Sequence, residues 1–132
     1  MNANDLKKAR QFLAQKEKER KKRLDARFAR AKSDFQKIIE TIIEKYQPEK
    51  IYQWGSLLDR RHFSEISDID IALEGITSAE IFFKLYGDIM SMTDFCVDII
   101  QLEKIEPEFA ELIKEKGKIV YERKRENTHP QK

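Results

Sequence analysis

Hydrophobic residues repeat along the chain with two different periods. Between residues 24 and 42, 81 and 89, and 109 and 113 they recur every three or four positions, which predicts helices. In four shorter segments they alternate with polar residues or form short apolar runs, which predicts strands at 50–54, 68–73, 94–101 and 118–122. The pattern therefore predicts an α/β (α+β) fold with a mixed sheet of about four strands and packed helices.

A long helix is expected at the start of the chain, because no Gly or Pro precedes Gly55 except Pro48, which should end the helix just beyond Tyr46. Its apolar stripe begins only at residue 24 and needs a surface to cover it, either in this chain or in a second one. A homo-oligomer through this helix, or a bound partner, is therefore one expectation. The stripe consists of Leu24, Phe28, Ala31, Phe35, Ile38 and Ile42.

Charge divides the chain into segments. Residues 1–34 hold 12 Lys and Arg against 5 Asp and Glu, whereas the remainder holds 14 against 19. We expect a charged helical extension at 1–34, one domain at 35–123, and a disordered tail at 124–132. The basic stretch could bind nucleic acid, but Glu17 and Glu19 interrupt it, so a solvated or partner-binding helix is favoured over nucleic acid.

Cysteine content and hydropathy indicate the compartment. Cys96 is the one cysteine of the 132 residues, so no internal disulfide can form, and its apolar strand suggests a buried thiol in a reducing environment. No apolar run approaches the length of a membrane span, and the first residues lack a signal core. These features predict a cytoplasmic protein with no membrane contact.

The segment between the first two predicted strands carries the candidate chemistry. Gly55 and Ser56 close the first strand, and after eleven residues Asp68 and Asp70 alternate with isoleucines. Because strand side chains alternate between faces, the two carboxylates should project from one face, where they repel each other unless a cation lies between them. Carboxylate oxygens are ligands suited to Mg²⁺, and a Gly-Ser turn suits close approach to a phosphate.

A third carboxylate is expected on the strand at 94–101. Asp98 lies on the opposite face from Phe95, Val97 and Ile99, and we expect it to be buried between Cys96 and Ile100, where an acid needs a partner. Asp98 is therefore the predicted third metal ligand. An ion pair with Lys or Arg is the alternative, and Asp94 is the weaker candidate for the site.

These motifs, a Gly-Ser pair, a gap of eleven, Asp-Ile-Asp and a later Asp in an apolar strand, resemble the DNA polymerase β nucleotidyltransferase superfamily. The short chain resembles its minimal nucleotidyltransferase (MNT) branch over roughly residues 35–123. The resemblance implies that Gly55 and Ser56 hold a triphosphate and that Asp68 and Asp70 bind two Mg²⁺ ions, with Mn²⁺ able to substitute. It also implies that Asp98 binds one metal and helps to deprotonate the attacking hydroxyl.

One departure from the family pattern concerns the cation for the γ-phosphate. Many relatives have Arg directly after the Gly-Ser pair, whereas this chain continues Leu57-Leu58-Asp59 before Arg60 and Arg61. Arg60 and Arg61 are therefore the candidates for nucleotide binding, with solvated loop charges as the alternative.

The resemblance implies an enzyme that moves a nucleoside monophosphate from an NTP, with ATP as the expected donor, to a hydroxyl acceptor. So small a domain needs the acceptor or a partner to supply the second wall of its cleft. The resemblance implies that this partner is a protein of the HEPN type in a toxin–antitoxin pair. The alternative is a non-catalytic, nucleotidyltransferase-like antitoxin or interaction module that acts by binding its partner. Changing the acids to alanine would abolish inhibition of the partner in the first case only.

Overall fold

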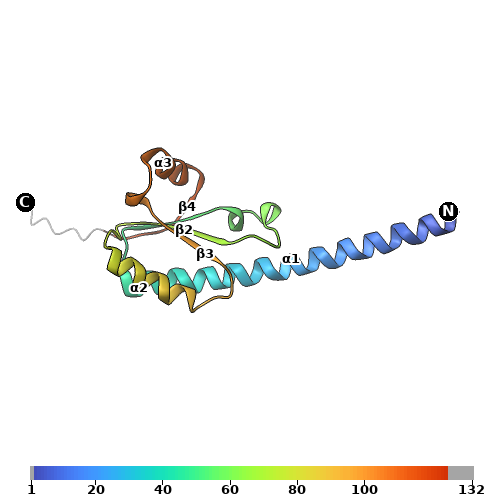
Figure 1. Cartoon of the computed structure of the whole chain (residues 1–132), viewed down its shortest axis with the longest axis horizontal. Coiled ribbons are helices and arrows are strands. Elements are labelled where there is room, and N and C mark those ends of the chain that lie inside the picture. Colours follow the sequence, from blue (N-terminus) through green and yellow to red (C-terminus); the bar gives the residue numbers. More distant parts are fainter. Residues whose placement is uncertain (1, 125–132) are drawn as a thin grey trace, which may run out of the picture.

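The computed structural model describes residues 2–124, which form three α-helices, four strands and three short 3-10 helices (Figure 1). The predicted disordered tail at 124–132 lies outside the described residues except for Lys124. The elements are α1 (Ala3–Tyr46), β1 (Lys50–Trp54), β2 (Ile69–Glu74), α2 (Ala79–Met90), β3 (Val97–Gln101), α3 (Pro107–Lys116) and β4 (Lys118–Glu122), with 3-10 helices at Ser56–Leu58, Arg60–His62 and Leu102–Lys104.

The strands of the described region form a single mixed sheet in the order β3-β2-β1-β4. β1 pairs antiparallel with both β2 and β4, and β2 pairs parallel with β3. The parallel pair requires a crossover, and α2 supplies it. The predicted mixed sheet of four strands with packed helices is thus confirmed.

Helices cover the two faces of the sheet unequally. α1 and α2 lie on one face, where the larger hydrophobic core contains Ile38 and Ile42 from α1 and Ile69 and Ile71 from β2 (Figure 1). α3 lies on the other face, over a smaller cluster that includes Tyr52. Strand β3 stands at one edge of the sheet, and α3 packs chiefly on β1, β4 and the 3-10 helix that follows β3. On the α3 face of β3, Ile100 packs against the smaller cluster but Asp98 is exposed, so this face is open at Asp98.

Helix α1 is capped at both ends, and it ends at Tyr46 as the sequence predicts. The Asn2 side chain accepts a hydrogen bond from the Asp5 N–H at 2.8 Å, and Gln47 takes a left-handed conformation at φ 49° before Pro48. Between these caps α1 runs unbroken for 44 residues.

The apolar stripe of α1 packs on its own domain. Leu24, Ala31, Phe35, Ile38 and Ile42 are buried, and the Phe28 ring meets the Phe63 ring edge-on at 5.2 Å between centroids. Burial thus begins ten positions before the domain boundary expected at residue 34, and the surface that covers the stripe is intramolecular.

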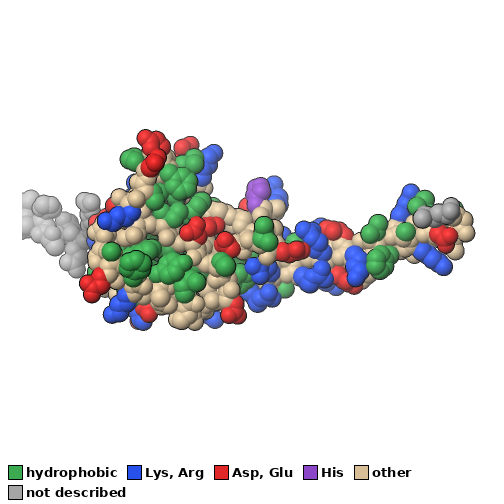
Figure 2. All heavy atoms as spheres, in the orientation of Figure 1, with side chains coloured by type: hydrophobic (Ala, Val, Ile, Leu, Met, Phe, Trp, Pro, Cys, Tyr) green, Lys and Arg blue, Asp and Glu red, His purple; other side chains and the backbone are tan. Residues whose placement is uncertain are grey.

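Before Leu24 the helix projects from the domain as an exposed arm (Figures 1 and 2). Its large apolar side chains there are Leu6, Phe12 and Leu13, all exposed. An oligomer formed through α1 stays a prediction. Its apolar contacts would come from these three residues. Although α1 is long enough to cross a bilayer, no helix among residues 2–124 is also apolar enough to do so.

Candidate functional site

The candidate carboxylates meet on the α3 face of the sheet. Ile69 and Ile71 point into the core beneath α1 and α2, so Asp70 between them points to the opposite face. The parallel register pairs Asp70 with Asp98 on β3, and the antiparallel register pairs it with Trp54 on β1. Asp68 lies just before β2 and is exposed. The structure therefore brings together the three acids that the sequence singled out.

Gly55 lies directly against Asp70. A Cβ atom built on Gly55 would stand 2.1 Å from Asp70 Oδ2, and Gly55 has φ 81°, a conformation that residues with a side chain rarely adopt. The sequence predicted glycine at this turn for close approach to a phosphate, and in this structure the approaching group is a carboxylate. Ser56 follows and begins a 3-10 helix at the same end of β1.

Asp70 is half-buried and its pKa is raised from the usual 3.8 to about 6. Burial is the largest cause, followed by the negative charges of Asp98 and Asp68. Within residues 2–124 no basic group counters this shift, so a deprotonated Asp70 lacks a compensating charge there. This is the electrostatic environment in which a cation binds favourably.

The donor set fits a hard cation, since it consists of carboxylate oxygens at adjacent positions of neighbouring strands. As the side chains stand, no three His, Cys, Asp or Glu residues within residues 2–124 are arranged to hold a metal ion. Asp98 and Asp68 are both exposed, and exposed carboxylates can rotate towards Asp70 without repacking.

Asp98 and Cys96 are more exposed than the sequence predicted. Asp98 lies on the α3 face of the edge strand β3 and Cys96 lies just before that strand, and both are exposed, so the expected burial of Asp98 between Cys96 and Ile100 was wrong, as was the buried thiol. Asp98 faces solvent beside Asp70 instead, where an incoming molecule can reach it. The strand itself begins at Val97, after Thr93 Oγ1 has accepted a hydrogen bond from the Phe95 N–H.

Arg60 and Arg61 are held in other interactions. Arg60 Nε donates to Asp25 Oδ1 on α1 at 2.7 Å, and Arg61 binds the Asp59 carboxylate, at 2.9 Å from its Nη2. The guanidinium of Arg61 lowers the pKa of Asp59 to about 2. In this conformation the structure therefore does not direct either arginine to the carboxylates.

An apolar pocket beside the site was not anticipated from the sequence. It has a volume of about 250 Å³ and lies next to Gly55, between Trp54 and the side chains Phe109, Leu112 and Lys116 of α3. The Trp54 and Phe109 rings meet edge-on at 6.0 Å. The helical spacing of Phe109 and Leu112 suggested a buried face, but both are exposed, and that exposure gives the site an apolar wall.

Comparisons with known proteins agree with this geometry. Residues 36–126 match the family model described as "Polymerase beta, Nucleotidyltransferase". Among solved structures, a chain from "Crystal structure the toxin-antitoxin MntA-HepT" is similar at a TM-score of 0.53 and 21% identity, over 70% of this chain and 73% of that one. No curated protein gave a significant match. The family model covers most of the chain and the fold agrees with it. The chain therefore belongs to the polymerase β nucleotidyltransferase family.

Proposed function

We propose that the protein transfers a nucleoside monophosphate from an NTP, with ATP as the donor, to a hydroxyl group. The observation that carries this proposal is the position of Asp70, which is paired in register with Asp98, lies against Gly55 and has a pKa raised to about 6. A carboxylate held in this way is costly to the isolated protein and becomes favourable when a cation and a phosphate are bound.

Each residue of the site has a role in this proposal. Asp68, Asp70 and Asp98 hold two Mg²⁺ ions, or Mn²⁺ in their place, and Gly55 and Ser56 bind the triphosphate. When bound, the ions polarise the α-phosphate and lower the pKa of the acceptor hydroxyl. Asp98 is exposed on the edge strand, so it can accept the proton of an acceptor that arrives from solvent.

The cationic contact to the γ-phosphate requires a local rearrangement. Arg61 is 87% exposed and is paired only with its near neighbour Asp59, whereas Arg60 is tied to α1 through Asp25. Because exposed ion pairs contribute little stability, Arg61 is the arginine that can turn towards a bound triphosphate at the smaller cost.

The proposed acceptor belongs to a partner protein of the HEPN type. The similar solved structure is titled as a toxin–antitoxin complex, which supports a partner of that kind for this chain. The open α3 face of β3 supports the same idea, since nothing in the described region forms a second wall over Asp98. A hydroxyl on the partner would complete the site from that side.

The experiment is a transfer assay with α-labelled NTPs, Mg²⁺ and the protein encoded by the neighbouring reading frame. We expect label from ATP to appear on the partner, and to be lost without Mg²⁺ or with Asp98→Ala. Asp94→Ala is the matched control, because Asp94 is an exposed acid just before β3 and outside the three-carboxylate group. Absence of label on every polypeptide and RNA tested would count against the proposal.

A second candidate function is an antitoxin that acts by binding alone. The observation that favours it is the engagement of both Arg60 and Arg61 with acids away from the site. Under this alternative, alanine at Asp68, Asp70 and Asp98 together would leave inhibition of the partner intact. Under the transfer proposal, the same triple change abolishes inhibition.

A further inference from the structure

Four arginines lie on one side of α1, where the helix leaves the domain. Arg20, Arg23, Arg27 and Arg30 are spaced by three, four and three residues, which places them along a single stripe. The apolar stripe next to them is buried against the domain from Leu24 onward. Figure 2 shows basic side chains gathered on this part of the molecule.

Two hollows open along this arginine stripe. One, of about 570 Å³, lies between α1 and the segment 90–95, and the other, of about 550 Å³, lies between α1 and Glu65. Arg27 and Arg30 line both hollows, and Arg23 lines the second. The stripe therefore borders a concave surface.

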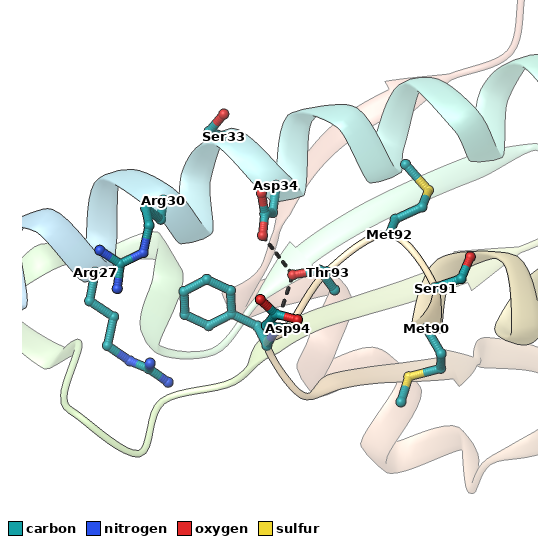
Figure 3. A pocket seen from close by; sticks show the side chains of 10 residues that line it. Arg27, Arg30, Ser33, Asp34, Met90, Ser91, Met92, Thr93 and Asp94 are labelled. Carbon is teal, nitrogen blue, oxygen red and sulfur yellow. Dashed lines mark hydrogen bonds between the residues drawn. The ribbon is translucent and has the colours of Figure 1, made fainter.

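The first hollow has its two arginines at one end (Figure 3). Arg27 and Arg30 lie at that end, and Met90 and Met92 lie at the other. The carboxylates of Asp34 and Asp94 lie between them, and Asp34 accepts a hydrogen bond from Thr93 Oγ1 at 2.6 Å. An anion is therefore attracted to the arginine end, away from the two acids.

Three of the four arginines have unused capacity as donors. Arg20 is paired with Glu17 and Glu65, but neither Arg23 nor Arg30 forms an ion pair within residues 2–124, and both are exposed. Arg27 lies over the Phe95 ring at 4.6 Å, with its Nε buried and without a hydrogen-bond partner in the described residues. A buried guanidinium N–H without an acceptor is costly, so Arg27 would gain from a small movement that lets an anion in the hollow reach it.

We propose that Arg23, Arg27 and Arg30 form a binding site for the sugar–phosphate backbone of a single-stranded nucleic acid. Guanidinium groups match phosphate oxygens in two-pronged geometry, and a basic groove that follows the backbone is the usual way to hold a single strand. Bases also stack on guanidinium planes. In this proposal the two hollows hold one nucleic-acid strand along the arginine stripe of α1.

A protein partner fits this surface less well. Protein interfaces have an apolar or aromatic centre, but the apolar stripe of α1 is already covered by its own domain, and the two methionines lie at the far end of the hollow. Nucleic-acid interfaces are more polar and more positively charged. The arginine stripe has that character.

The site is separate from the proposed transfer chemistry, because it needs neither NTP nor metal. One contact links the arginine stripe to the backbone next to the carboxylates. Arg27 Nη2 donates to the carbonyl of Ser67, at 3.5 Å, and Ser67 directly precedes Asp68. Binding can therefore be tested with the carboxylates intact or changed to Asn.

The test measures the affinity of the full chain for a fluorescently labelled 20-nucleotide RNA by anisotropy over a range of salt concentrations. The test variant is Arg23→Gln with Arg30→Gln. The matched control is Lys18→Gln with Lys21→Gln, which removes the same net charge from exposed positions on a different side of the same helix.

We expect the arginine variant to bind on the order of tenfold more weakly, with a salt slope smaller by about 1.4, since each lost phosphate contact to a single strand changes the slope by about 0.7. The lysine control should bind as the wild type does, and Asp68→Asn with Asp70→Asn should leave binding unchanged.

Three results would overturn the proposal. Equal losses in the arginine and lysine variants would mean that the helix attracts polyanions by net charge alone. A polyglutamate peptide that displaces the RNA at equal charge concentration would assign the surface to an acidic protein. Absence of RNA binding by the wild type at about 100 mM salt, where specific nucleic-acid sites normally bind, would remove the site altogether.

Discussion

Asp70 and Asp98 lie directly opposite each other on the parallel strands β2 and β3, and both project from the face of the sheet that carries α3. Asp98 is exposed at the sheet edge, whereas Asp70 is half-buried against Gly55. The two acids therefore differ in environment, and they should differ in what their replacement does to stability and activity.

Replacing Asp70 with Asn should stabilise the metal-free protein at neutral pH. The folded pKa of Asp70, about 6, lies above the usual 3.8, so the folded state binds more protons than the unfolded state between these values. Stability conferred by the protonated form is lost as the pH rises through this window. After allowance for solvent screening, we expect Asp70→Asn to raise the free energy of unfolding by about 1 to 2 kcal/mol at about pH 7.5.

Urea unfolding in EDTA measures this effect. At about pH 3.5, below both pKa values, the variant and the wild type should be equally stable. Asp94→Asn should have no comparable effect at either pH. Destabilisation by Asp70→Asn at neutral pH would mean that its carboxylate has a compensating partner in solution.

The pair Asp68→Asn and Asp70→Asn should remove Mg²⁺-dependent nucleotide binding without unfolding the domain. The amides keep the shape of the side chains and relieve the repulsion, but they cannot supply anionic ligands to a divalent cation. Isothermal calorimetry with ATP, in Mg²⁺ and in EDTA, provides the measurement. Binding that keeps its Mg²⁺ dependence in the double variant would refute the assignment of these ligands.

Asp98→Ala should reduce turnover more than nucleotide affinity. We expect kcat to fall by about 100-fold or more, because a positioned general base contributes at least that factor, while the Kd for ATP changes only a few-fold. Single-turnover kinetics combined with equilibrium binding separates the two quantities. Equal losses in kcat and in ATP affinity would mean that Asp98 contributes to binding the triphosphate instead.

The effect of truncating α1 on stability should depend on whether the deletion extends past Leu24. Removing residues 1–22 deletes only exposed side chains, so the free energy of unfolding should stay within about 0.5 kcal/mol of the wild-type value. Removal through Ala31 also deletes Leu24 and Phe28 from the core and should cost about 3 kcal/mol or more. Thermal melts and light scattering test both variants, and an unchanged melting temperature for the longer deletion would contradict the packing of the stripe.

Gly55→Ala should destabilise the protein and disturb the site, because its Cβ would overlap Asp70 Oδ2 and its φ of 81° is strained for alanine. We expect a loss of about 1 to 3 kcal/mol. Gly87→Ala is the control, since Gly87 lies in α2 with nothing within 4 Å of an added Cβ. That change should stabilise by about 0.5 to 1 kcal/mol. Similar effects of the two substitutions would contradict both the left-handed conformation of Gly55 and its close contact with Asp70.

Local patterns in the sequence were sufficient to predict most elements of the fold. Strand β1 at 50–54, α3 at Pro107 and the end of α1 at Tyr46 follow from alternation, a proline at the first helical position and a proline stop. The resemblance assigned Asp68, Asp70 and Asp98 to one site, and the parallel pairing of β2 with β3 places Asp70 opposite Asp98. Element boundaries of this kind depend on residues that are close in the sequence, and the pairing of the two acids depends on a single pair of strands.

Features that depend on the whole assembly could not be predicted in this way. Alternation assigns Cys96, just before β3, and Asp98, within it, to one face, but their exposure results from the position of β3 at the sheet edge, where α3 leaves them uncovered. The engagement of Arg60 with Asp25 joins positions 35 residues apart. Likewise, the stripe from Leu24 showed that a partner surface exists without showing that it belongs to the same chain.

The continuity of α1 gives the molecule a mechanical property. One unbroken helix about 66 Å long, at 1.5 Å per residue, has its C-terminal half inside the core and its N-terminal half in solvent. Because no Gly or Pro interrupts it, the arm has no hinge where it leaves the domain. A sideways load near Asn2 is therefore transmitted as a torque to the packing around Leu24 and Phe28, with the arm acting as a lever on the domain.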